Sequence, residues 1–137
     1  NNMENCYNLM QPAMVSNGTS QTTRYPMVAY SYYDAAAANE ANGTTWIVYD
    51  NEIIVANHSY SILGTVTAND KKYIVLRNPY GRLWGADPTH NAISPYLYTG
   101  KWSPTTNFYR YLSSDDGVFA LQDTRFAYYF QRFGWVQ

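Results

Sequence analysis

The segment NHSYSILGTVTANDKKYIVLRNPYG, residues 57–81, decides the expected fold of this chain. Its alternation of apolar and polar side chains predicts two antiparallel strands joined by a polar turn at residues 68–71. The even-numbered positions form the more apolar face, from His58 to Val66 in the first strand and from Lys72 to Asn78 in the second. His58 and Asn78 are therefore expected nearly opposite each other at the open end of the hairpin, with Cβ atoms about 4.5–5.5 Å apart.

A histidine beside an asparagine has two interpretations. In the first, a partly buried histidine is satisfied by an amide and has a structural role only. In the second, the amide holds the imidazole in one tautomer while the other ring nitrogen takes the proton of a thiol, as thiol-based catalysis requires. The spacing of His58 and Asn78 leaves both interpretations open.

Length and charge limit the class of protein. The chain has 137 residues and a formal net charge of −1, which predicts one domain over residues 1–137 and gives no electrostatic reason to expect nucleic acid or a membrane surface as a partner. No apolar run reaches the roughly 18 residues that cross a bilayer, and the first residues lack the pattern of a signal peptide, so we expect a soluble protein. The scarcity of lysine and the Asn-X-Ser/Thr sequons at Asn17, Asn42 and Asn57 favour secretion only slightly, and the location stays undetermined.

Composition favours strands over helices, because the chain holds 15 tyrosines together with many threonines and asparagines. We predict an α+β fold, with a mainly antiparallel sheet, or a barrel-like one, and short peripheral helices. Besides the hairpin, strands are expected at residues 25–33, 44–50, 52–57, 107–112 and 117–122. Helices are expected at residues 3–15 and 123–133. Residues 34–44 are expected to form a loop with room for one helical turn, and residues 81–104 a long ordered loop.

The sequence around the His–Asn pair closely resembles the calpain family of cysteine peptidases. NHSYSILG and LRNPYG are similar to the family's Gly-His-Ala-Tyr-Ser-type and Leu-Arg-Asn-Pro-Trp-Gly-type strands, which carry its catalytic histidine and asparagine. The resemblance extends to a Trp-rich loop, a closing Asp-Gly strand and helix, and an opening helix and strand. These correspond to WGADPTHNAISPYLYTGKW, SSDDGVFALQDTRFAYYF, CYNLMQPAMVSNG and YPMVAYSYY. Together they cover the second, mainly β lobe of the peptidase core and nothing before it.

The resemblance implies roles for three residues. His58 would be the general base, Asn78 its orienting partner, and Tyr80 an aromatic shield in place of the usual tryptophan. In the family, the nucleophilic cysteine and the oxyanion-hole glutamine belong to a separate helical lobe, which this sequence does not contain. The implied partners are therefore a Cys-bearing helical lobe or chain and a protein or peptide substrate.

Cys6 is the only cysteine, which excludes an internal disulfide and a cysteine-based zinc site. The stretch ENCYNLM has a faint likeness to the sequence around the family's nucleophile. However, Pro12 interrupts the long helix that a papain-like nucleophile should start, and the residues that follow align better with the helix that opens the β lobe. We expect a small buried cysteine rather than a nucleophile.

Calcium is the one cofactor that the resemblance raises, because the family's β lobe binds it through acids in the Trp-rich loop and the Asp-Gly turn. Asp115 and Asp116 are the only acids that would support such a site here. The loop instead reads Trp102-Ser103-Pro104, and Val118 follows the turn glycine. Since calcium takes six or more oxygen ligands, we expect neither a calcium site nor another cofactor.

Three functions remain open at this stage. The favoured one is the His/Asn-bearing half of a calpain-like cysteine endopeptidase. The first alternative is a non-catalytic module that binds a glycan or a protein through Trp84, Tyr96, Tyr98 and Trp102. The second alternative is a one-lobe peptidase that uses Cys6. A lone β lobe should expose an aromatic patch around His58, Tyr60 and Tyr80 or cover it by association, whereas a self-sufficient module should fill this surface with its own side chains.

Overall fold

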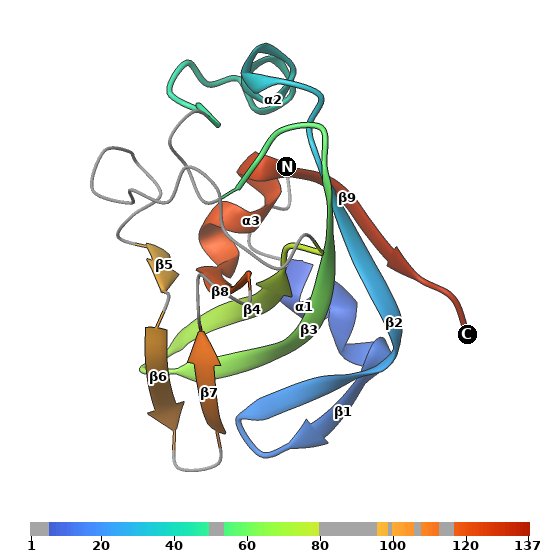
Figure 1. Ribbon diagram of the computed structural model, residues 1–137, viewed down its shortest axis with the longest axis vertical. Helices are drawn as coiled ribbons and strands as arrows, with labels where there is room; N and C mark the ends of the chain where they lie inside the picture. The colour runs from blue at the N-terminus through green and yellow to red at the C-terminus, as the bar shows by residue number, and fades with distance from the viewer. Residues whose placement is uncertain (1–5, 50–53, 80–95, 99, 106–107, 113–116) are drawn as a thin grey trace.

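The predicted hairpin lies in the middle of the sheet in the computed structural model, which describes residues 6–49, 54–79, 96–98, 100–105, 108–112 and 117–137 (Figure 1). Its strands are β3 (Ser59–Ala68) and β4 (Lys71–Arg77). The turn residues Asn69 and Asp70 have φ angles of 53° and 63°. Positive φ at both central positions is the geometry of a type I′ turn, whose twist suits an antiparallel hairpin. The prediction of this hairpin and its turn is confirmed.

The described strands form an α+β fold with an open, antiparallel sheet. The sheet has seven strands, six of them in the order β1-β2-β3-β4-β8-β5. β1 pairs with the first half of β2, and β9 pairs with the second half of β2 along the same edge (Figure 1). Since neither β1 nor β9 pairs with β5 in the part of the chain described, these strands form an open sheet and not the barrel-like alternative. The remaining bounds are β1 (Met14–Asn17), β2 (Ser20–Ser31), β5 (Leu97–Tyr98), β8 (Val118–Gln122) and β9 (Phe130–Trp135).

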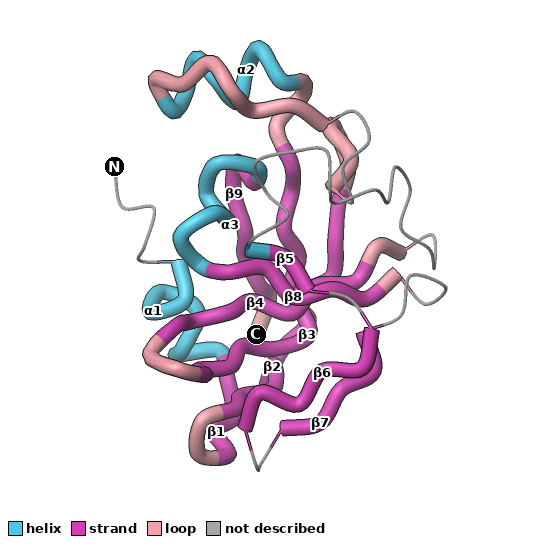
Figure 2. The backbone as a smooth tube through the Cα atoms, turned by 90° about the vertical axis from the view of Figure 1, so that its left-hand side faces the viewer, coloured by secondary structure: helices cyan, strands magenta, loops and turns pink. Residues whose placement is uncertain are grey.

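A second, two-stranded sheet consists of β6 (Gly100–Thr105) and β7 (Phe108–Leu112). It lies at the opposite end of the molecule from helix α2 (Ala35–Asn42), as both views show (Figure 2). The prediction of a strand near residues 107–112 is confirmed, whereas the expected loop at residues 81–104 contains β5 and β6.

The helices in the described part of the chain are short, as predicted, but the helix predicted at residues 3–15 is wrong beyond Ala13, because β1 begins at Met14. The helices are α1 (Cys6–Met10), which continues into a 3₁₀ turn at Gln11–Ala13, then α2 and α3 (Asp123–Tyr129). Asp34 caps α2 because its Oδ1 accepts a hydrogen bond of 2.8 Å from the N–H of Ala37. No helix in the described part of the chain is long and apolar enough to cross a membrane.

The predicted strands at residues 44–50 and 52–57 are wrong wherever the structure describes them, since no strand lies within residues 44–49 or 54–57. The side chain of Asn39 replaces the missing strand partner: its Nδ2 donates to the carbonyl of Ile47, and its Oδ1 accepts from the N–H of Ile47, each at 3.0 Å. One amide thus satisfies both backbone groups of a residue that reads as a strand centre. The loop predicted at residues 34–44 is mostly the helix α2.

The predicted helix at residues 123–133 ends at Tyr129, and the chain turns directly into β9. Phe130 is 3% exposed and lies in the core, so the chain gains burial by pairing with β2 instead of adding a helical turn. Tertiary contact therefore overrides the local helical pattern here.

A bulge in β3 changes which side chains face the core. Ile62 pairs with Leu76, but the next pair is Gly64 with Val75, so Leu63 is an extra residue. Tyr60 and Ile62 belong to the main core cluster, whereas Val66 beyond the bulge belongs to a smaller cluster on the other face. The predicted even-numbered face from His58 to Val66 is therefore correct only as far as Ile62.

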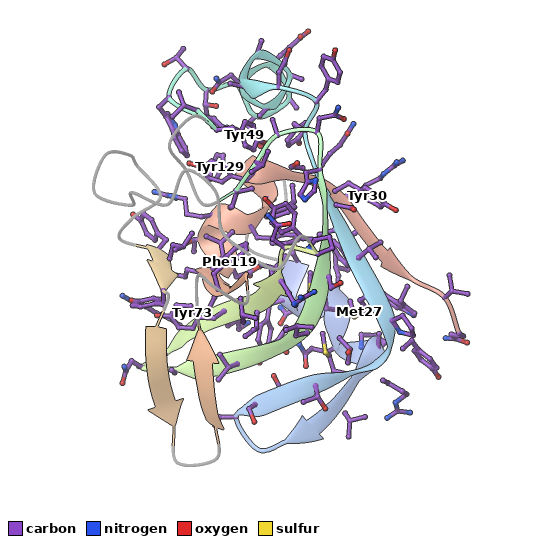
Figure 3. The ribbon with its side chains drawn as sticks, in the orientation of Figure 1. Met27, Tyr30, Tyr49, Tyr73, Phe119 and Tyr129 are labelled. Atoms are coloured by element: carbon purple, nitrogen blue, oxygen red, sulfur yellow. The ribbon has the colours of Figure 1, made fainter. Side chains whose placement is uncertain are left out.

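The main core lies beneath the open end of the hairpin. Tyr60 packs edge-on against Phe119 of β8 and Phe130 of β9, with ring centroids 5.8 and 5.4 Å apart. Tyr129 lies deeper towards α2, with the ring of Tyr49 5.7 Å away, and Figure 3 shows these two rings together above Phe119. This aromatic core supports the strand ends that carry His58 and Asn78.

Candidate active site

His58 is fixed by the end of strand β2, although it lies just before β3. Its N–H donates to the hydroxyl of Ser31 at 3.0 Å, and its carbonyl accepts from the N–H of Ser31 at 3.0 Å. The preceding Asn57 has a φ of 52°, a left-handed conformation that asparagine tolerates, and its N–H donates to the carbonyl of Tyr32 at 2.7 Å. The backbone on both sides of the imidazole is therefore held in place.

Asn78 is fixed from the other side of the hairpin. It directly follows β4 and is 0% exposed. Its N–H donates to the carbonyl of Gly117 at 2.8 Å, just before β8 begins. Gly117 has a φ of 72°, which a residue with a side chain rarely adopts. A glycine therefore allows the tight entry into β8 that anchors the asparagine.

The side chains of His58 and Asn78 meet in a hydrogen bond, with Nε2 and Oδ1 2.9 Å apart. An amide oxygen can only accept, so Nε2 carries the proton and Nδ1 is the basic nitrogen of the neutral ring. Since Ser61 opposes Arg77, continuing the ladder places Tyr60, and not His58, opposite Asn78. The predicted contact is confirmed, but His58 reaches Asn78 diagonally.

Tyr60 supports the imidazole from below. The two rings meet edge to face at 90°, with centroids 5.2 Å apart. The hydroxyl of Tyr60 accepts a 2.7 Å hydrogen bond from the N–H of Val55, and burial raises the pKa of Tyr60 above its ordinary value. Tyr60 therefore stays neutral and acts as a packing and hydrogen-bonding support.

The expected exposed aromatic patch is wrong for Tyr60, which is only 1% exposed. Phe119 and Phe130 from the same chain cover its ring. Tyr80, the predicted aromatic shield, lies outside the described residues, as does Trp84.

A surface pocket of about 480 Å³ lies beside the pair. Its walls come from the end of β2, the entry to β3, the exit of β4 and the start of β9. His58 is one of its lining residues, and Asn78 immediately precedes another, Pro79. The described residues that line it are Tyr30, Ser31, Tyr33, Asn57, His58, Ser59, Pro79, Gln131 and Arg132.

Cys6 does not belong to the described lining of this pocket. It lies in α1 and is 8% exposed. Burial, and secondarily the carboxyl group of Asp123, raises the pKa of its thiol to about 11. Reactive cysteines have lowered pKa values, so Cys6 has the properties of a structural cysteine.

The remaining predicted site residues do not come together in the described part of the chain. Asp115 and Asp116 lie outside it, and within it no three His, Cys, Asp or Glu side chains form a group that could hold a metal. The guanidinium carbon of Arg125 lies 3.9 Å from the ring centroid of Tyr96. The rings of Tyr98 and Tyr73 meet edge to face, with centroids 5.4 Å apart. Trp102 lies in β6, opposite Arg110.

Two supporting residues were missed by the sequence reasoning. Tyr60 shares the even-numbered face with His58, so alternation could have indicated its role. Ser31 had no such signal, because its contact with His58 depends on how the distant strands β2 and β3 pair.

The pair can act as an oriented base, since the amide of Asn78 holds one ring nitrogen and the other can take a proton. No protein-family model, curated protein or solved structure matches this chain. The function of the chain must therefore be inferred from its own residues, above all from His58 and Asn78.

Proposed function

We propose that this chain is the His/Asn-bearing half of a cysteine endopeptidase, and that a second chain or lobe supplies the nucleophilic cysteine. The 2.9 Å hydrogen bond between His58 Nε2 and Asn78 Oδ1 is the observation that carries the proposal. This contact places a proton on Nε2 and so fixes the tautomer of the neutral ring, in which Nδ1 is the basic nitrogen that a thiol requires. The calpain-like sequence around both residues supports the same assignment.

The reaction would be acyl transfer. Nδ1 of His58 takes the proton of the partner's thiol, and the thiolate attacks the carbonyl carbon of a peptide bond. The imidazolium then returns that proton to the leaving amine, which departs as a thioester forms. Water hydrolyses the thioester with His58 again acting as the base, and the thiol is restored. Asn78 keeps the ring in place through both steps.

The proposal names two partners. One is a helical lobe or chain that brings a cysteine to His58, and the other is a protein or peptide substrate. Acyl transfer of this kind requires no cofactor, and we propose none. Tyr80 would shield the pair from water, as the resemblance implies.

Activity-based labelling of the native protein tests this proposal. The chain is purified under mild conditions from its natural source and treated with a thiol-directed peptidyl vinyl sulfone, followed by intact mass analysis and N-terminal sequencing. We expect the probe on a cysteine outside residues 1–137, either in a co-purifying chain or in another lobe of the same polypeptide, and none on Cys6. A His58→Ala variant should lower the labelling rate by about 100-fold or more, since a general base contributes roughly 10²–10⁴-fold.

The second histidine of the sequence, His90, supplies the matched control. His90→Ala should label at the unchanged rate. A lone 15.7 kDa species whose activity no thiol reagent affects would refute the proposal for this chain.

A non-catalytic binding module is the second candidate, and the burial of Tyr60 favours it, because the chain covers this side chain with its own residues. The aromatics first considered for such binding give it less support, since Tyr96 and Tyr98 pack on Arg125 and Tyr73. The labelling experiment separates the two candidates, because a binding module gives no labelled partner. A one-lobe peptidase that uses Cys6 has no structural support, given the burial and raised pKa of that thiol.

A further inference from the structure

The pocket beside His58 has a polar wall that is built by a bulge in β9. Tyr30 of β2 pairs with Arg132, but the next residue, Ser31, pairs with Phe130, so Gln131 is an extra residue in β9. A bulge of this kind redirects side chains at a strand edge. Gln131 and Arg132 are adjacent and exposed, and both line the pocket.

The register brings three of the lining residues into one row. Tyr30 lies between Arg132 on β9 and Ser59 on β3, opposite both. Directly opposed residues in a sheet project from the same face. The guanidinium of Arg132 lies over the ring of Tyr30 at 4.9 Å, which orients the charged group while leaving it exposed. Figure 3 shows Tyr30 where β2 runs beside β9.

The described lining of the pocket carries a net positive charge. Arg132 is its permanently charged residue, and no aspartate or glutamate is among the described lining residues. Gln131, Ser59 and Asn57 add side chains that can donate hydrogen bonds. Tyr33, which is 72% exposed, adds an aromatic edge. An acceptor with negative charge fits this set, and a guanidinium binds a planar carboxylate through two parallel hydrogen bonds.

We propose that this pocket binds the side-chain carboxylate of an acidic residue in an extended peptide, close to His58. As a substrate subsite it rests on the proposed peptidase function, whereas binding itself requires only the pocket. Arg132 supplies the charge, Gln131 supplies an amide donor, and Tyr30 keeps the guanidinium in place. The peptide bond to be cleaved would then lie near the imidazole because His58 lines the same pocket.

Binding is tested by NMR titration of the ¹⁵N-labelled 137-residue chain with capped pentapeptides, which carry no terminal charge. Three peptides differ only at the central residue: acetyl-Ala-Ala-Glu-Ala-Ala-amide and its Gln and Lys counterparts. We expect the Glu peptide to bind about five- to tenfold more tightly than the Gln peptide, as for one solvent-accessible charged hydrogen bond. The shifts should centre on the side-chain signals of Arg132 and Gln131 and weaken with added salt.

Two variants test whether Arg132 causes the preference for the Glu peptide. Arg132→Gln should bind the Glu and Gln peptides equally, whereas Arg24→Gln should keep the preference, because Arg24 is an exposed arginine of β2 outside the pocket lining. Equal binding of the three peptides to the unaltered chain would overturn the proposal. So would acetate or inorganic phosphate that binds as tightly as the Glu peptide, because the pocket would then be a small-anion site.

The outcome is separable from that of the peptidase proposal. His58→Ala should retain the preference for the Glu peptide even though it slows labelling of the partner cysteine by about 100-fold or more. Loss of that preference in His58→Ala, in a variant whose NMR spectrum shows a folded chain, would overturn the assignment of the carboxylate to Arg132.

Discussion

At Gly64 a single added methyl group should strain the sheet. This glycine follows the bulge in β3, where the backbone of β2 comes very close. A Cβ at Gly64 would overlap the backbone carbonyl oxygen of Gln21, with the carbonyl carbon at 3.3 Å. Neither atom is the movable end of a side chain, so β2 and β3 themselves must shift apart.

The expected cost of Gly64→Ala is about 2–3 kcal/mol, the upper part of the range for overpacking a well-packed interior. The average unfolding entropy of about 2.1 cal/mol/K per residue gives roughly 0.3 kcal/mol/K for a chain of this size, so the melting temperature should fall by about 7–10 °C. Guanidinium denaturation followed by circular dichroism measures the cost directly, and an unchanged slope shows that the unfolded state is unaffected.

Gly134→Ala is the matched control. A Cβ at Gly134 meets no atom within 4 Å, so this change should alter stability by no more than about 0.5 kcal/mol. If Gly64→Ala were as stable as the control, the close approach of β2 and β3 at the bulge would be refuted.

The other predictions concern the pair and its support. Asn78→Ala should cost about 1–3 kcal/mol through the lost partner of His58 Nε2. In the proposed peptidase complex it should also slow peptide hydrolysis about 10- to 100-fold, part of the roughly 10²–10⁴-fold that a general base contributes. Imidazole ¹⁵N shifts should show a changed tautomer ratio, and an unchanged ratio would contradict the orienting role of Asn78. Tyr60→Phe keeps the ring but removes the acceptor of the Val55 N–H, and chemical denaturation should show a loss of about 1–2 kcal/mol; no loss would contradict that hydrogen bond. Cys6 has a pKa raised from 9.0 to about 11 in the folded chain, so the unfolded chain loses its thiol proton first as the pH rises. The stability difference between the unaltered chain and Cys6→Ser should therefore fall between about pH 9 and pH 11, and a constant difference would contradict the burial of the thiol.

The hairpin and the His–Asn contact were predictable because both depend on local patterns. Alternation located β3 and β4, and the polar residues Asn69 and Asp70 between them tolerate the positive φ angles that the observed turn requires. Position near the open end of that hairpin then sufficed to bring His58 and Asn78 together, even though the register proved diagonal.

Other parts were not predictable because distant residues determine them. A strand pattern around Ile47 gives no sign that the amide of Asn39 will satisfy its backbone. The helical pattern after Asp123 gives no sign that Phe130 will begin a strand against β2. The one-residue bulge at Leu63 reversed the faces of β3 beyond it, which alternation alone cannot reveal.

The anchoring of the pair has a consequence for folding. His58 is held by Ser31, and Asn78 is held by Gly117, so the geometry of two residues in one hairpin depends on strands far before and after it. During synthesis the hairpin is complete well before Gly117 is made. An early hairpin would therefore hold the imidazole and the amide without their final orientation, and the site would reach its working geometry only after β8 docks. We therefore expect the final geometry of the His58–Asn78 pair to form late in folding, together with the segment that begins at Gly117.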